Sequence, residues 1–240
     1  MSVFAISDLH LSGGESINKS MDMFGPRWLN HASKIIKTWR SLITDSDTVV
    51  IPGDISWAMT LDDAIADLSV IDSLPGLKII GKGNHDFWWT TISKMNRALA
   101  SAGIKTIRFL QGNAFNADGL VICGARGWFF SSSDQPDIFE TDYEKIVLRE
   151  ASRLRSSIAA GLKISGGDPA PLRVFLHFPA VLLGEVCEPI LTVLLETGVR
   201  RVYYGHIHGN VSVPRSFESQ GVTFTIISAD YLNFTPVLVT

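Results

Sequence analysis

The chain has 240 residues, of which 46% are hydrophobic and 19% are charged, and its formal net charge is −3. This length suits a single domain, and the hydrophobic content excludes a disordered or fibrous protein. The slight acidic excess argues against a general nucleic-acid partner, which would favour a basic surface. We therefore expect one domain over residues 1–240.

The two cysteines, Cys123 and Cys187, lie far apart without a Cys-x-x-Cys pattern. They suit neither a disulfide framework nor a thiolate metal site, which favours a reducing compartment. The first residues reach a charge at Asp8 and lack the basic start of a signal peptide. No apolar run approaches the roughly 18 residues of a transmembrane span. We expect a cytoplasmic protein without a membrane partner.

Short apolar runs alternate with longer segments of helical period, which predicts a layered α/β fold. The apolar runs are predicted to be buried strands. In chain order they are Val3–Ser7, Thr48–Ile51, Leu77–Gly81, Ile104–Leu110, Leu120–Gly124, Leu172–Leu176, Arg201–Tyr204, Val222–Ile227 and Val237–Val239.

Five segments between these strands carry apolar residues at helical spacing. They are Pro26–Ile43, Leu61–Leu74, Ile92–Ala102, a long segment from Thr141 to Leu162, and Glu185–Thr197. Pro26 suits the first turn of a helix, and Thr60 and Asp63 have the spacing of a capping box. Thr141 and Glu144 predict a second capping box, at the start of the long helix.

Two stretches show neither pattern and are predicted to be long loops. Residues 11–25 directly follow the first strand, and residues 128–139 precede the long helix. Long loops inside a compact domain are often functional. We expect these loops, together with residues 55–60, to determine the choice of substrate.

Five of the predicted strands end in residues that bind metals well. The motifs at these ends are Asp8-Leu9-His10, Gly53-Asp54, Gly83-Asn84-His85-Asp86, His177 and Gly205-His206-Ile207-His208. In layered α/β sheets, ligand sites gather at the carboxyl ends of strands. In an extended chain, residues two apart also point to the same side. The sequence therefore predicts that these side chains converge on one rim.

The ordered set of motifs is too specific to arise by chance. Composition gives a random expectation of about 0.01 for Gly-His-x-His and about 0.001 for Gly-Asn-His-Asp. The Asp-x-His pair alone is weak, because about 0.4 such pairs are expected at random. A single histidine at a strand end is usually a hydrogen-bonded structural residue. Taken in order, however, the set indicates a metal site.

These motifs resemble the five ordered motifs of the calcineurin-like metallophosphoesterase superfamily, and all five are intact between residues 8 and 208. The resemblance implies a four-layer α-β-β-α sandwich of two mixed β-sheets flanked by helices. It also implies a phosphohydrolase with a two-metal centre. The first ion would be held by Asp8, His10 and His208, the second by Asn84, His177 and His206, and Asp54 would bridge the two ions.

The ligand types suit Mn, Fe, Zn or Ni ions, and the identity of the metal stays open. Two such cations would lower the pKa of a bound water, and the resulting metal-bound hydroxide would attack a phosphomonoester or phosphodiester. His85 matches the family position that orients the phosphate or protonates the leaving oxygen. Asp86 is expected to hold His85 in position. Arg126 is a candidate either for phosphate contact or for a structural pair with a carboxylate.

Several aromatic residues lie close to these motifs along the chain. These residues either form an aromatic rim around the substrate or, as we favour, pack in the core between layers. They are Trp57, Trp88, Trp89 and Trp128. His31 falls within the first predicted helix and matches no motif. We expect it to be a surface or interlayer histidine.

Some branches of the superfamily fit poorly. Its protein serine/threonine phosphatases usually extend the second motif to Gly-Asp-x-Val-Asp-Arg-Gly, whereas Gly53-Asp54 continues here as Ile55-Ser56-Trp57. The lipid-A pathway pyrophosphatases carry Arg where His85 stands. A non-catalytic metal-binding scaffold on the same fold is the alternative from another class. The expected partner is a small phosphorylated substrate, whose identity stays open, as does the oligomeric state.

Overall fold

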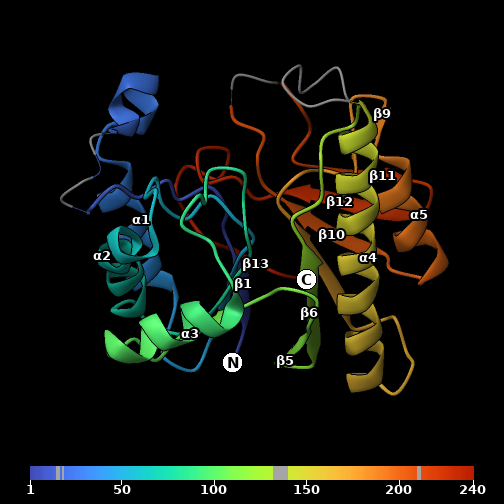
Figure 1. Ribbon diagram of the computed structural model, residues 1–240, viewed down its shortest axis with the longest axis horizontal. Coiled ribbons are helices and arrows are strands. Elements are labelled where there is room, and N and C mark those ends of the chain that lie inside the picture. The colour runs from blue at the N-terminus through green and yellow to red at the C-terminus, as the bar shows by residue number, and fades with distance from the viewer. Residues whose placement is uncertain (15–16, 18, 132–139, 210–211) are drawn as a thin grey trace.

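The computed structural model of the chain describes residues 1–14, 17, 19–131, 140–209 and 212–240. A five-stranded and a six-stranded sheet form its centre, and helices lie on the outer face of each sheet (Figure 1). The layers therefore follow the order α-β-β-α. This confirms the fold that the resemblance implied.

The five-stranded sheet has the strand order β13-β1-β2-β3-β4. Its strands are β1 (Val3–Ala5), β2 (Thr48–Ile51), β3 (Leu77–Ile80), β4 (Ile107–Phe109) and β13 (Val237–Leu238). Strands β1 to β4 pair in parallel, and β13 pairs antiparallel with β1. The helices of this layer are α1 (His31–Leu42), α2 (Leu61–Asp72) and α3 (Ile92–Ser101).

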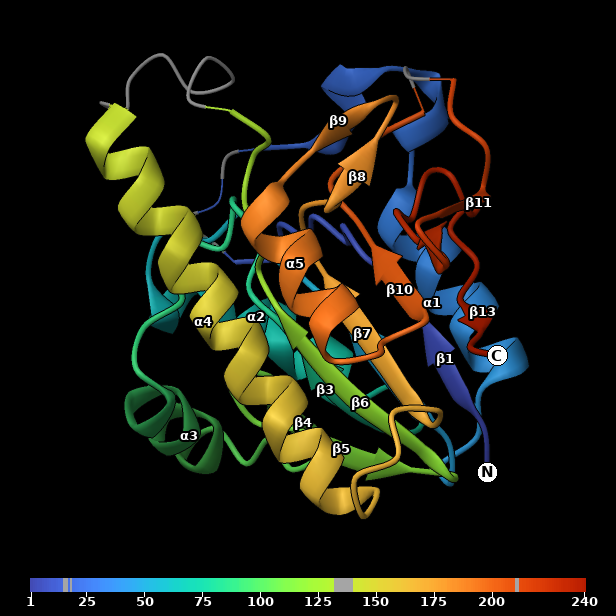
Figure 2. The same cartoon turned by 90° about the vertical axis from the view of Figure 1, so that its right-hand side faces the viewer.

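The six-stranded sheet has the strand order β11-β12-β10-β7-β6-β5. Its strands are β5 (Phe115–Ala117), β6 (Leu120–Ala125), β7 (Leu172–Leu176), β10 (Arg201–Tyr204), β11 (Ser216–Ser219) and β12 (Val222–Ile226). Its four central strands are parallel, and the edge strands β5 and β11 are antiparallel. Figure 2 shows α4 (Glu140–Ile164) and α5 (Glu188–Glu196) lying across this sheet.

The central strands are buried on both faces, which explains why they appear in the sequence as continuous apolar runs. In β7, Phe175 belongs to the core between the sheets, while its neighbours Val174 and Leu176 belong to the core under α4 and α5. Tyr203 and Tyr204 of β10 divide between the two cores in the same way. This alternation follows from the two-residue period of a strand.

The two sheets meet at the carboxyl ends of β1 and β12. The amide of Ser7 donates a hydrogen bond to the carbonyl of Ile227 at 2.8 Å, and the amide of Ala229 donates to the carbonyl of Ser7 at 2.9 Å. Ser7 and Ser228 form an isolated parallel bridge. The carboxyl ends of the parallel strands of both sheets therefore share one rim.

The prediction of one helix over Pro26–Ile43 is wrong at its start. Pro26–Trp28 forms a short 3-10 helix, and α1 begins only at His31. Asn30 lies between them in the left-handed conformation, with φ of 56°. Asparagine tolerates this conformation better than most residues, so it allows the chain to turn between the two helices.

Other boundaries also differ from the predictions. The long helix begins at Glu140, so Thr141 lies inside it rather than at its N-cap. The segment predicted as a helix from Glu185 instead begins with strand β9 (Glu185–Val186), which pairs with β8 (Val181–Leu182). The helix α5 starts at Glu188 because Pro189 favours the first turn of a helix. Strands β5 and β11 were not predicted, because these edge strands are short and carry few apolar residues.

The predicted loops fall partly outside the described residues, at 15, 16, 18 and 132–139. Met21–Phe24, within the first loop, forms a 3-10 helix. Among the described residues, no helix combines the length and the apolar character needed to cross a membrane.

Candidate metal centre

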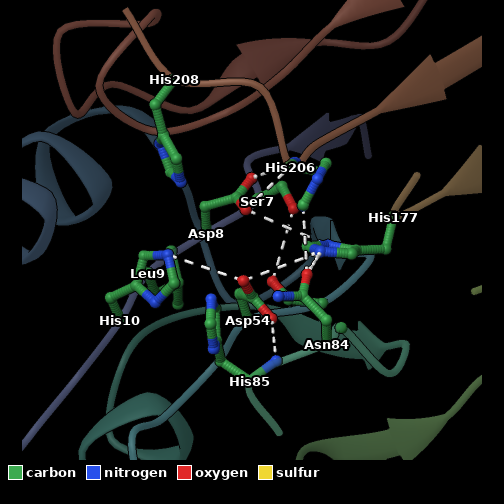
Figure 3. A network of polar contacts seen from close by, with 12 residues as sticks. Ser7, Asp8, Leu9, His10, Asp54, Asn84, His85, His177, His206 and His208 are labelled. Atoms are coloured by element: carbon green, nitrogen blue, oxygen red, sulfur yellow. Dashed lines mark hydrogen bonds and ion pairs between the residues drawn. The ribbon is translucent and has the colours of Figure 1, made fainter. Parts of the chain in front are cut away.

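The motif residues converge at the shared rim, as the sequence predicts. Their side chains lie around one small region, although they come from the ends of five different strands in two sheets (Figure 3). Strands β1, β2 and β3 supply Asp8, His10, Asp54, Asn84 and His85, and strands β7 and β10 supply His177, His206 and His208. The fold thus brings together side chains that are up to 200 positions apart in the chain, from Asp8 to His208.

Four of these residues adopt a left-handed backbone conformation. The φ angles are 60° at Asp8, 46° at His10, 52° at Asp54 and 66° at His206. Residues other than glycine rarely adopt such angles, and the strain is characteristic of functional sites. The backbone therefore bends sharply after β1, β2 and β10, where these four residues enter the centre.

Two motif glycines permit close approach of the backbone. A Cβ atom at Gly83 would overlap the side chain and the backbone nitrogen of Asp54. A Cβ atom at Gly205 would overlap the side chains of Ser7 and Asp8. Each glycine directly precedes a motif residue, Asn84 or His206, so a larger residue would displace the centre.

The first group of potential metal ligands comprises Asp8, His10 and His208. One nitrogen or oxygen atom from each lies within 4.8 Å of the others. Asp8 and His10 are almost fully buried, whereas His208 is partly exposed. The ring of Trp57 stacks on His10 with 4.8 Å between ring centroids. This group matches the first ligand set that the resemblance implied.

The second group forms around Asn84. Its Oδ1 atom lies 2.6 Å from Nε2 of His177 and 3.1 Å from Nδ1 of His206. Asp8, Asp54 and His177 also form a compact group whose ligand atoms lie within 4.8 Å of one another. The two carboxylates therefore lie beside the histidines of the second set as well.

Asp54 lies between the two groups. Its Oδ2 atom is 3.6 Å from Nε2 of His10 and 3.6 Å from Nε2 of His177. Its Oδ1 atom accepts a hydrogen bond from the backbone amide of His85 at 2.8 Å. One carboxylate oxygen thus faces a histidine of each set, and the other is held by the backbone.

The charges of the centre favour a bound cation. Burial raises the pKa of Asp8 to about 6, and burial together with the neighbouring Asp8 and Asp86 raises the pKa of Asp54 well above its ordinary value. Burial lowers the pKa of His10 and His177 well below the usual range, so both rings are neutral at pH 7. Neutral imidazoles are suitable metal ligands, and a bound cation would favour the ionised form of the buried carboxylates by offsetting burial and the repulsion of Asp54 by its neighbours.

The buried polar atoms of the centre support the same conclusion. The Nδ1 atoms of His10 and His177 are buried and have no hydrogen-bond partner among the described residues. Buried polar atoms normally have partners. The donor set of carboxylate, imidazole and amide oxygen matches that of transition-metal sites. The residues present therefore fit metal ions.

Asp86 was expected to hold His85 in position, and its hydrogen-bond partners among the described residues are other groups. The buried carboxylate of Asp86 instead accepts hydrogen bonds from the backbone amides of Asp54 at 2.9 Å, Ile55 at 2.9 Å and Gly83 at 2.8 Å. It also accepts a 3.0 Å bond from the indole of Trp88. Asp86 therefore fixes the turn that carries Asp54, and among the described residues it makes no hydrogen bond to the imidazole of His85.

Of the two readings for Arg126, the structure shows the pairing with a carboxylate. Its Nη2 atom lies 3.5 Å from Oε1 of Glu150 in α4, and its guanidinium lies over the ring of Trp128. Its backbone carbonyl accepts hydrogen bonds from the amides of His177 at 3.0 Å and Phe178 at 2.9 Å. Arg126 thus supports the second ligand group through its backbone, and its side chain lines a separate cavity.

Two further residues lie near the first ligand group: His31, which takes the interlayer position among the two that we expected, and Asp230. His31 is buried, and its Nε2 atom lies 3.1 Å from the carbonyl of Leu9 and 3.2 Å from that of His10. Asp230 was not predicted, and its Oδ1 atom lies 3.1 Å from Nδ1 of His208. The residue follows β12, and only its place after a strand could have indicated it.

The tryptophans pack in the core, as we favoured. Trp57, Trp88, Trp89 and Trp128 are all at most 9% exposed. Trp57 also contacts the centre. The centroid of its ring lies 4.4 Å from the ring centroid of His85 and 4.8 Å from that of His10. Its position after Asp54 was the only signal of this second role.

Fold and site together define a class of proteins with a candidate metal site, in which acidic and imidazole side chains gather at the carboxyl ends of strands in a double-sheet sandwich. A family model described as calcineurin-like phosphoesterase matches residues 1–210. The chain belongs to this family.

Comparison with solved structures agrees on the fold. The chain is similar to the protein of unknown function AQ665 from Aquifex aeolicus, with a TM-score of 0.50 and 15% sequence identity. The similarity covers 99% of this chain and 95% of that chain. None of the curated proteins matches this chain.

Proposed function

We propose that this protein is a phosphohydrolase that uses two metal ions to cleave a phosphomonoester or a phosphodiester. The observation that carries the proposal is the position of Asp54, whose Oδ2 atom lies 3.6 Å from a histidine nitrogen of each ligand group. A carboxylate between two ligand sets is the feature that a two-metal site requires.

The two ligand sets follow from the groups described above. Asp8, His10 and His208 would hold one ion, and Asn84, His177 and His206 would hold the other, with Asp54 shared between them. Mn, Fe, Zn and Ni ions all suit these ligands. When bound, such ions would supply Lewis acidity for the phosphoryl group and lower the pKa of a water molecule.

The imidazole of His85 faces the same region without belonging to either ligand group. Its ring centroid lies 5.7 Å from that of His10. Burial, and then the neighbouring Lys19 and His208, lower the pKa of His85 to about 4. The ring is therefore neutral at pH 7 and can donate one N–H to a phosphoryl oxygen or to the leaving oxygen.

A cavity of about 370 Å³ opens beside the first ligand group. His10, His85 and His208 line it on the side of the centre, and Trp28 and Trp57 form apolar walls. Ligand pockets of enzymes have volumes of roughly 300–1,000 Å³. This cavity has room for the leaving group of a small phosphorylated substrate.

Hydrolysis of 4-nitrophenyl phosphate and of bis(4-nitrophenyl) phosphate, with added Mn²⁺, tests the proposal. We expect one or both to be cleaved, and we expect Asp54→Asn to lose metal and turnover together. Asp142→Asn is the matched control, because Asp142 is exposed and pairs only with Lys145 on α4 among the described residues. Metal content is measured by mass spectrometry.

Two outcomes would contradict the proposal. A protein that binds metal but cleaves neither ester, nor any member of a panel of phosphorylated metabolites and cyclic nucleotides, would instead be a non-catalytic scaffold on this fold. An Asp54→Asn variant with unchanged metal content would show that the ions bind elsewhere.

A further inference from the structure

A second cavity of about 370 Å³ lies at the same rim, toward β4 and β6. Lys82 after β3, Arg126 after β6 and Arg153 of α4 bring three cations to its wall, with Glu150 as the acidic residue. Its lining residues differ from those of the cavity beside His10 and His208. Residues of α4 and of the loop before α3 both contribute to its lining.

The positive charges in this cavity exceed the negative ones. Oε1 of Glu150 lies 2.5 Å from Nη1 of Arg153 and 3.5 Å from Nη2 of Arg126, so one carboxylate oxygen serves both guanidinium groups. Lys82 has no ion pair of its own among the described residues. The uncompensated cations favour an anion in the cavity.

Arg126, which lines the cavity, also carries a hydrogen-bond donor without a partner among the described residues. This donor is its buried Nε atom. A buried donor without a partner costs free energy, so the surroundings of this guanidinium are not fully satisfied by the protein. Arginine presents its donors in a planar fork that matches carboxylate and phosphate oxygens. Trp89 and Gln111, which also line the cavity, are joined by a hydrogen bond from the indole of Trp89 to Oε1 of Gln111 at 3.1 Å.

We propose that this cavity is a second anion-binding site, in which Lys82, Arg126 and Arg153 bind a phosphate or carboxylate group. Two of the residues that line this cavity are connected to residues of the metal centre. Lys82 precedes Asn84 by two residues, and the backbone of Arg126 holds the amide of His177 at 3.0 Å. The anion is either a second acidic group of the substrate or a separate small anion, and both share this chemistry.

Titration of the metal-loaded protein with inorganic phosphate, followed by calorimetry, tests the site directly. We expect two phosphate equivalents in the wild-type protein. Arg153→Gln and Lys82→Gln should each weaken the binding of the phosphate in the anion site at least fivefold. Asp54→Asn should remove the phosphate bound at the metal centre. A single equivalent that Asp54→Asn abolishes, or two equivalents that neither Arg153→Gln nor Lys82→Gln weakens, would overturn the proposal.

Two further variants separate anion binding from a loss of folding. Glu150→Gln removes the negative charge of the cavity while keeping its shape, so phosphate should bind severalfold more tightly, a change opposite to that of Arg153→Gln. Arg155→Gln is the matched control, because Arg155 lies on α4 and pairs with Glu196 outside the cavity. Weaker binding in Glu150→Gln, or equal weakening in Arg155→Gln, would contradict the site.

Kinetics distinguishes the two sources of the anion, and only this part rests on the proposed hydrolysis. If the site binds part of the substrate, Arg153→Gln should raise the KM for phosphomonoesters that carry a second phosphate or carboxylate. This increase should be at least fivefold larger than the increase in KM for 4-nitrophenyl phosphate. If the KM values for both classes of substrate change equally while Arg153→Gln weakens the binding of one phosphate, the site binds a separate anion. The calorimetric result stands even if no ester is cleaved, so the two proposals fail independently.

Discussion

The carboxylate of Asp86 accepts a 2.9 Å hydrogen bond from the backbone amide of Asp54, across two adjacent strands of one sheet. Asp86 is fully buried and does not line the cavity beside the first ligand group. It accepts further hydrogen bonds from the amides of Ile55 and Gly83. The turn that presents Asp54 therefore depends on a residue that binds no metal itself.

Asp86→Asn is expected to disturb this turn, because an amide group cannot accept all of these hydrogen bonds. We expect the free energy of unfolding to fall by about 2–4 kcal/mol, since buried donors lose their partner. Metal content should fall as well. Chemical denaturation and metal analysis check the two effects, with Asp142→Asn as the exposed control. Normal stability and normal metal content in Asp86→Asn would refute this role.

His85→Ala is expected to keep both metals and to lose turnover. The imidazole belongs to neither ligand group, while the backbone amide that supports Asp54 remains in the variant. Loss of a group that assists proton transfer typically costs about 10²–10⁴-fold in rate. His206→Ala serves as the comparison, because it should lose metal. Equal metal loss in the two variants would contradict the separate role of His85.

Asp230→Asn is expected to weaken the first metal position. Asp230 orients the ring of His208 through the 3.1 Å contact with Nδ1, and it also accepts a 2.7 Å bond from the amide of Gly209. Substitution of such supporting carboxylates typically lowers metal affinity about 10–100-fold. A competition titration with a chelating dye measures the affinity. Asp168→Asn, at an exposed turn, is the control, and equal affinities in all three proteins would exclude this support.

Lys78 gives a pH dependence that is independent of the metal centre. Its side chain is fully buried in β3 and donates to the carbonyl of Leu74 and to Oγ1 of Thr106. Burial lowers the pKa of Lys78 to about 8. Between pH 8 and about 10.4, the unfolded chain binds more protons than the folded one, so this residue stabilises the fold increasingly as pH rises.

Comparison with Lys78→Met isolates this effect, because the cysteines and tyrosines titrate equally in both proteins. From pH 7 to pH 10, the unfolding free energy of the wild-type protein should rise relative to that of the variant, by up to about 3 kcal/mol. Urea denaturation at several pH values measures the difference. A difference that stays constant with pH would show that Lys78 titrates normally in the fold.

Several features of the centre could be predicted from local patterns. Asp8, Asp54 and His177 each follow a run that is apolar enough to be a buried parallel strand, and such strands place their carboxyl ends at one rim. The helix and strand ends were less accurate, as at Asn30 and Glu185, because single residues determine where an element begins.

The partners of the supporting residues could not be predicted in this way. Asp86 binds the turn at Asp54 rather than its neighbour His85, and Arg126 pairs with Glu150 of a helix from another part of the chain. Spacing along the chain gives no information on which of several polar groups a side chain will meet. That choice depends on how the sheets and helices pack.

The sequence by itself determined which side chains carry metal-binding chemistry and that each one follows a strand, because residue type and hydrophobic period are local properties. Only the tertiary structure decided that Oδ2 of Asp54 lies between His10 and His177. It alone also gathered Lys82, Arg126 and Arg153 around one cavity. Both arrangements depend on distances between segments remote in the chain, and the packing of the two sheets and α4 sets those distances.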